Sequence, residues 1–132
     1  MRQQFELAVK TIIDRALDIL AVKGYAFRPM RRVNPVRKNS GYIEGHTSLR
    51  HKTITIDIYT ARLRKPKKIS AILAVLAHEI AHHQKPPYRQ YYRGRLITRW
   101  HYPAFYKQVN KNIKKFKQDE TLSKYFEKSI MV

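Results

Sequence analysis

The chain lacks cysteine entirely, and only 9 of its 132 residues are acidic. Without cysteine it can form no disulfide, and any metal ion would have to be bound by histidine or carboxylate side chains. The sequence also has no uninterrupted apolar run of the roughly 18 residues that a membrane-spanning helix requires, and its first residues predict an amphipathic helix rather than a signal peptide. We therefore expect an intracellular protein, cytoplasmic or nucleoid-associated, with no membrane span.

The few acidic residues are outnumbered by 28 lysines and arginines, which gives a formal net charge of +19. Residues 1–27 are nearly neutral, so the excess lies in residues 28–68 and 85–128. Surface ion-pair networks need both signs of charge, whereas an excess of one sign is typical of proteins that bind a polyanion. We expect a nucleic acid as a partner, DNA first, although charge alone does not distinguish DNA from RNA.

Residues 78–82 read His-Glu-Ile-Ala-His and lie within a stretch, about residues 71–83, whose apolar positions recur at helical spacing. His78 and His82 are therefore one turn apart on one face of a helix, so both rings can reach a single ion. Glu79 lies on an adjacent part of the helix and can reach a water molecule on that ion. Two histidine ligands with a neighbouring glutamate are typical of a zinc hydrolase.

A catalytic zinc ion usually has three protein ligands and leaves the fourth position to water. We expect His101 to be the third ligand, because it comes just before a second predicted helix and the intervening segment is long enough to turn back. Glu120 is the alternative, since one large group of zinc proteases takes a glutamate from a later helix. We expect His83 to support the ligands or to lie on the surface, and His46 and His51 to have surface or core roles.

These motifs together resemble the SprT-like zinc metalloproteases, a family that includes the Spartan-type proteases, which digest proteins crosslinked to DNA. The family pattern is His-Glu-[Leu/Ile]-Ala-His, a basic loop, and then His-Gly-x-x-Phe. This chain matches it at residues 78–82, His101 and Phe105, and has Tyr102 in place of the glycine. The resemblance covers about residues 40–116. Archaeal minigluzincins are similar in size and layout, but they use a glutamate ligand.

The resemblance implies a zinc-dependent metallopeptidase that hydrolyses peptide bonds through a zinc-activated water, with Glu79 as the general base. One Zn2+ ion would be held by His78, His82 and His101, and the expected substrates are DNA-associated proteins. Zincins bind substrate extended along a sheet edge, but the sequence does not show which strand forms that edge. Two other functions remain open. The same site could hydrolyse nucleotides or other phosphate esters, or the chain could be a nucleic-acid-binding module with a non-catalytic zinc.

Arginines and tyrosines are interleaved in residues 84–100, between the second and the third histidine. Such side chains can bind phosphates and stack on exposed bases, but a lid packed by its own aromatic residues fits equally well. The arginines expected at a nucleic-acid interface are Arg89, Arg93, Arg95 and Arg99. The tyrosines expected as candidates for stabilising an oxyanion are Tyr92, Tyr102 and Tyr106.

The length predicts one domain, residues 1–132, of the α+β class. The predicted order resembles a minimal zincin-like fold: an N-terminal helix, a small, mostly antiparallel sheet, the HExxH helix, a loop and C-terminal helices. The predicted helices cover residues 3–22, 71–83, 103–117 and 121–130, the predicted hairpin covers 42–49 and 53–59, an irregular or edge segment covers 28–39, and the loop covers 84–100.

Overall fold

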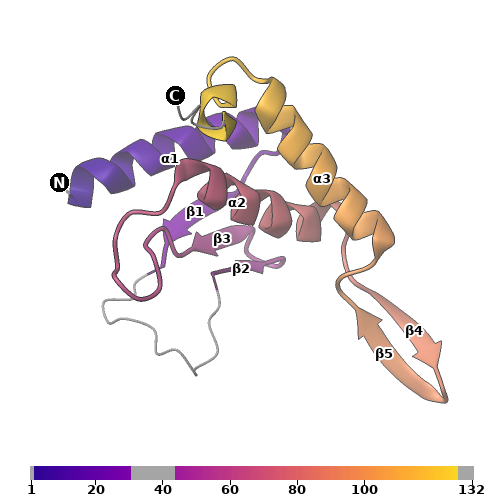
Figure 1. Ribbon diagram of the computed structural model, residues 1–132. Coiled ribbons are helices and arrows are strands. Elements are labelled where there is room, and N and C mark those ends of the chain that lie inside the picture. The colour runs from indigo at the N-terminus through magenta and orange to yellow at the C-terminus, as the bar shows by residue number, and fades with distance from the viewer. Residues whose placement is uncertain (1, 31–43, 128–132) are drawn as a thin grey trace.

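The computed structural model describes residues 2–30 and 44–127. Helix α2 is its central element: it contacts the sheet strands β2 and β3 and also the helices α1 and α3 (Figure 1). The α+β class is confirmed, whereas the zincin-like arrangement stays a prediction. The elements are α1 (Arg2–Ile19), β1 (Ala26–Pro29), β2 (Gly45–Ser48), β3 (Thr53–Ile56), α2 (Ile69–Gln84), β4 (Tyr88–Tyr92), β5 (Arg95–Arg99), α3 (Pro103–Gln118) and the 3-10 helix η1 (Ser123–Phe126).

The core forms around α2 because this helix buries many apolar side chains against the elements around it. Four of the apolar residues that recur at helical spacing, Ile72, Leu73, Leu76 and Ile80, are all buried, at 1% exposure or less. Burying each such side chain stabilises the fold by about 1.5–3 kcal/mol. Helix α2 is therefore anchored on several sides, which makes it a rigid support for the polar side chains it carries. None of the helices in the described ranges is long and apolar enough to cross a membrane.

The three-stranded sheet has the order β1-β3-β2, so that β2 is an edge strand. Strands β2 and β3 form the predicted antiparallel hairpin, whose residues 42–43 lie outside the described part. The sheet is nevertheless mixed rather than mostly antiparallel, because β1 joins β3 in parallel. The segment predicted as irregular or edge begins inside β1, an edge strand that ends at Pro29, where a proline is tolerated. Residues 31–39 of that segment lie outside the described part.

The segment 84–100 is not a loop but contains an antiparallel hairpin, β4–β5, which points away from the body of the molecule (Figure 1). Its two-residue turn is Arg93-Gly94, and both residues have positive φ angles, 51° and 78°. That conformation is the type I′ turn that matches the twist of paired strands. Among the described residues, no other helix or strand contacts the hairpin.

The helix predicted over residues 121–130 is also corrected. Only the short 3-10 helix η1 forms among its described residues, and 128–130 lie outside them. The Asp119 carboxylate accepts hydrogen bonds from the backbone N–H groups of Thr121 and Leu122, at 3.0 and 3.1 Å. This side chain turns the chain sharply after α3, and Leu122 is then fully buried.

Candidate metal centre

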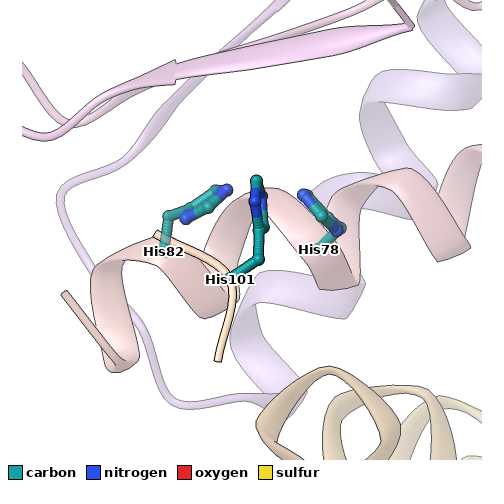
Figure 2. Close-up of side chains that lie close together, drawn as sticks. All are labelled: His78, His82 and His101. Atoms are coloured by element: carbon teal, nitrogen blue, oxygen red, sulfur yellow. The ribbon is translucent and has the colours of Figure 1, made fainter. Parts of the chain in front are cut away.

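His78, His82 and His101 come together from two separate parts of the chain. One ring nitrogen from each lies within 4.8 Å of the others. Figure 2 shows the three rings converging, two from α2 and one from the segment between β5 and α3. In a tetrahedral zinc site the ligand nitrogens lie about 3.4 Å apart, so the rings need to close by little more than ~1 Å. The three histidines, which we name the histidine cluster, could therefore hold one metal ion, as predicted.

A buried aromatic ring packs against all three rings of the histidine cluster. Phe105, in the first turn of α3, is 0% exposed. Its ring centroid lies 5.0 Å from that of His78, 4.5 Å from that of His82 and 5.1 Å from that of His101. Because Pro103 occupies the start of α3, the helix begins two residues after His101 and brings Phe105 against all three rings.

A buried amide joins the two helices behind the cluster. Asn112 of α3 is 1% exposed. It donates hydrogen bonds to the Ala77 carbonyl at 3.2 Å and to Gln84 Oε1 at 2.7 Å, both on α2. Its own carbonyl oxygen accepts a bond from Gln108 Nε2 at 2.9 Å. These bonds fix the position of α3 relative to α2, and nothing in the local sequence pattern indicated them.

The protonation of the histidines suits a metal ion. Burial, and then the neighbouring His78 and His101, lower the pKa of His82 to about 4. Burial, and then His101, also lower the pKa of His78. Both rings are therefore neutral at neutral pH, the form that binds metals. His82 Nδ1 is buried and has no hydrogen-bond partner among the described residues. An unpartnered buried nitrogen costs about 1–3 kcal/mol, so the donor set fits an ion.

Glu79 lies beside the cluster and is only 6% exposed. Burial raises the pKa of its carboxyl group to about 7. A cation held by the histidines would lower this pKa again, because it favours the ionised form. Glu79 lies close to β2: a Cβ atom on Gly45 would meet Val75 Cγ1 at 2.8 Å and Glu79 Oε2 at 3.4 Å. The glycine therefore allows the strand to approach the helix at the carboxylate.

A cavity of about 290 Å³ brings these groups together. It is bordered by Glu79, the three clustered histidines and Trp100 on one side, and by residues 45–47 of β2 on the other. A larger cavity of about 520 Å³ adjoins it at His78 and Glu79, where the small side chains of Ala71 and Ala74 leave room. Sequence reasoning missed the part played by β2. The available signal was Gly45, since a glycine inside a strand often marks a close approach.

The outer edge of β2 faces this cavity. The Asp57 N–H donates to the Glu44 carbonyl at 2.7 Å, which makes this a hydrogen-bonded pair of the β2–β3 ladder. Hydrogen-bonded pairs alternate along antiparallel strands, so the next one is His46 with Thr55. The backbone groups of Gly45 and Thr47 consequently point outward, away from β3. They can pair with an extended chain in the cavity.

His83, expected to support the metal ligands or to lie on the surface, contacts β2 and Tyr25. Its Nε2 bonds with Thr47 Oγ1, and its ring lies edge-on to Tyr25 at 4.6 Å. Thr47 Oγ1 donates to the Thr53 carbonyl, at 3.1 Å, so it accepts from the His83 N–H. His83 therefore ties α2 to β2. His46 is exposed on the sheet face opposite α2, as strand alternation requires.

The structure argues against the alternative third ligand. Glu120 is exposed and lies beyond the C-terminal end of α3, whereas His101 precedes its N-terminal end. A helix of this length, 16 residues, separates its two ends by about 24 Å. Glu120 is consequently not part of the histidine cluster, nor is the exposed His51.

The three tyrosines expected as oxyanion candidates lie in different places. The Tyr102 hydroxyl donates to the Pro86 carbonyl at 2.8 Å, so its hydrogen is already in use. Tyr92 lies next to the hairpin turn, with the guanidinium of Arg93 at 5.2 Å from its ring. Tyr106 is the one whose ring contacts the cluster, stacked on His101 at 6.2 Å. The assignment of an oxyanion residue stays a prediction.

The four arginines expected at a nucleic-acid interface, Arg89, Arg93, Arg95 and Arg99, all lie in the hairpin β4–β5, and we call them the hairpin arginines. Alternation places Arg95 and Arg99 on one face and Arg89 on the other, with Arg93 in the turn. Aromatic side chains between and beside them are exposed, which contradicts a lid packed by its own aromatics. The exposed fractions are 44% for Tyr88, 76% for Tyr91, 49% for Tyr92 and 45% for Trp100.

No protein-family model matches the chain, and neither the curated proteins nor the solved structures contain a significant match. Its function is therefore argued from the cluster, the neighbouring carboxylate and the strand edge.

Proposed function

We propose that this protein is a zinc-dependent metallopeptidase in which His78, His82 and His101 bind the ion and Glu79 is the general base. The observation that carries this proposal is the convergence of the three ring nitrogens within 4.8 Å, beside a buried carboxylate. Three imidazole ligands leave one coordination position open, which suits a redox-inactive Lewis acid such as Zn2+. A structural zinc site would normally fill all four positions with protein ligands.

In this mechanism an ion held by His78, His82 and His101 would supply Lewis acidity to a water molecule and to the scissile carbonyl. Glu79 takes the proton from the attacking water and later delivers it to the leaving amine. The outward-pointing backbone groups of Gly45 and Thr47 hold the substrate main chain extended, by β-sheet pairing. Because this pairing reads no side chain, it supports hydrolysis of many sequences, and the adjoining cavity at Ala71 and Ala74 accommodates one substrate side chain.

We further propose that the substrates are proteins bound to nucleic acid, DNA first. The support comes from the hairpin β4–β5, where the hairpin arginines and exposed tyrosines alternate on a projecting ribbon. Arginine binds phosphates, and each base stacked on an aromatic ring contributes about 1–3 kcal/mol. The net charge of +19 acts in the same direction. The hairpin leads directly into His101, so a nucleic acid bound there would lie close to the histidine cluster.

The test is cleavage of a basic DNA-binding protein by the zinc-loaded chain, with and without single-stranded DNA. We expect cleavage in the presence of DNA and none from Glu79→Gln, which should still bind zinc. The matched control is Glu120→Gln, an exposed glutamate outside the site, which should cleave normally. Retained activity in Glu79→Gln would refute the assigned base. Turnover of nucleotides or phosphate esters without any protein cleavage would refute the peptidase and support the alternative hydrolase.

A further inference from the structure

The third histidine is held differently from the other two. His78 and His82 belong to α2, which is anchored by the core on several sides. His101 is exposed and lies between β5 and α3. It follows a hairpin that, within the described residues, contacts no other helix or strand. The position of its ring therefore depends on α3, whose Phe105 it contacts, and on how the base of this hairpin is fixed.

Tyr102, the next residue, closes that base. Its hydroxyl donates a hydrogen bond to the Pro86 carbonyl at 2.8 Å. Its ring lies edge-on to the ring of Tyr88 at 4.9 Å. Pro86 and Tyr88 belong to the segment that leaves α2, and Tyr102 belongs to the segment that enters α3. One side chain thus joins the two ends of the hairpin.

The backbone carries this connection to the ligand. Tyr102 is the residue just before α3, with an extended backbone at φ −136° and ψ 166°. On the far side of His101, the ring of Trp100 packs edge-on against His82 at 5.9 Å. His101 therefore lies between two residues that each contact the end of α2 or the segment just after it. Trp100 contacts His82, and Tyr102 contacts Pro86. The hydrogen bond from Tyr102 can be removed by Tyr102→Phe, which takes away only the hydroxyl oxygen.

We propose that Tyr102 is a positioning residue for His101 and that it sets the affinity of the site for its metal ion. This inference rests on the proposed metal centre. With the hydroxyl bonded to Pro86, the His101 ring is held near its binding position before the ion arrives. Without it, metal binding must also order the base of the hairpin, and affinity falls. Tyr102 is also the position where the SprT-like pattern has glycine, which has no side chain to make this connection.

The experiment measures zinc affinity by competition with a chromophoric chelator, using the purified chain, residues 1–132. We expect Tyr102→Phe, which keeps the ring and loses the hydroxyl, to raise the Kd for zinc about three- to tenfold. Tyr102→Gly should raise it by more than about tenfold. The matched control is Tyr91→Phe, a hairpin tyrosine that is 76% exposed, which should leave the Kd unchanged.

A double-mutant cycle separates positioning from a general loss of structure. In a His101→Ala background, Tyr102→Phe should no longer change the remaining zinc affinity, because the ring it positions is gone. An unchanged Kd in Tyr102→Phe, or an equal fold-change in both backgrounds, would overturn the inference while leaving the metal centre intact. A wild-type chain that binds no zinc would overturn the metal centre itself and the inference with it.

Discussion

In the metal-free protein, replacing Glu79 with glutamine should raise the free energy of unfolding at alkaline pH much more than at acidic pH. Burial raises the pKa of Glu79 from its ordinary 4.5 to about 7, so the folded protein keeps a proton there that the unfolded chain loses. Where the folded state binds more protons, stability falls as the pH rises. The wild type therefore loses stability between these two values, whereas glutamine does not titrate.

The size of the effect follows from the shift in pKa. A difference of about 2.5 units, at 1.36 kcal/mol for each, corresponds to about 3 kcal/mol. Water in the two cavities that Glu79 borders screens part of this, so we expect a difference of about 1–3 kcal/mol. A bound zinc ion should reduce the difference, since a nearby cation stabilises the ionised carboxylate. The stability difference therefore depends on whether the ion is bound, as well as on the burial of Glu79.

The assay is urea unfolding of chelator-treated wild type and Glu79→Gln at several pH values across that interval. The free energy of unfolding of each protein is plotted against pH, and one curve is subtracted from the other. The subtraction removes contributions common to both proteins, including that of His82, whose pKa is lowered by burial to about 4. Glu120→Gln, at an exposed site, serves as the control and should show no such trend. A stability difference between Glu79→Gln and wild type that does not change with pH would refute the reasoning.

Three further perturbations test the supporting structure. Asp57→Ala should destabilise the protein by about 3–5 kcal/mol in urea unfolding, because it leaves the Arg64 guanidinium buried without its 2.9 Å partner; a loss below about 1 kcal/mol would contradict this. Gly45→Ala should cost about 1–3 kcal/mol by the same assay, partly recovered by Val75→Ala, and no recovery would contradict the close contact of β2 with α2. Replacing the four hairpin arginines with glutamine should weaken the salt dependence of single-stranded DNA binding. In anisotropy titrations, the slope of log affinity against log salt concentration should fall in magnitude by up to about 3, and an unchanged slope would show that DNA binds elsewhere.

The parts of this protein that could be predicted from sequence are those set by local pattern. Helix α2 runs over Ile69–Gln84 where residues 71–83 were expected, because its apolar residues recur at helical spacing. Helix α3 begins at Pro103, as expected from the position of a proline that fixes the first turn. His101 could be selected because both flanking helices were correctly placed. The histidine cluster could thus be predicted from the position of α2, which carries two of the histidines, and from the start of α3, which follows the third.

The parts that were missed depend on contacts between distant residues or on weak turn signals. The hairpin β4–β5 is exposed on both faces, so it lacks the alternation of apolar and polar residues that reveals a half-buried strand. Its turn begins with Arg93 where asparagine or glycine would have been the usual signal. The parallel pairing of β1 with β3 joins residues more than 25 positions apart and leaves no local trace. Asp57 falls on the polar side of a predicted strand, yet it is 0% exposed because Arg64 pairs with it.

The structure shows how several of the few acidic residues are used. Asp57, Asp119 and Glu44 each pair with a basic side chain, and Glu79 borders the histidine cluster. The sequence has no acidic residue between Glu79 and Asp119, a stretch that includes the whole hairpin. The contacts of Arg99 there are with the Tyr92 ring at 5.3 Å and with Gln90 at 3.0 Å, groups that carry no net charge. The positive charge of the hairpin is therefore not neutralised by its own segment. This is the physical reason to expect an anionic partner at this ribbon, next to His101.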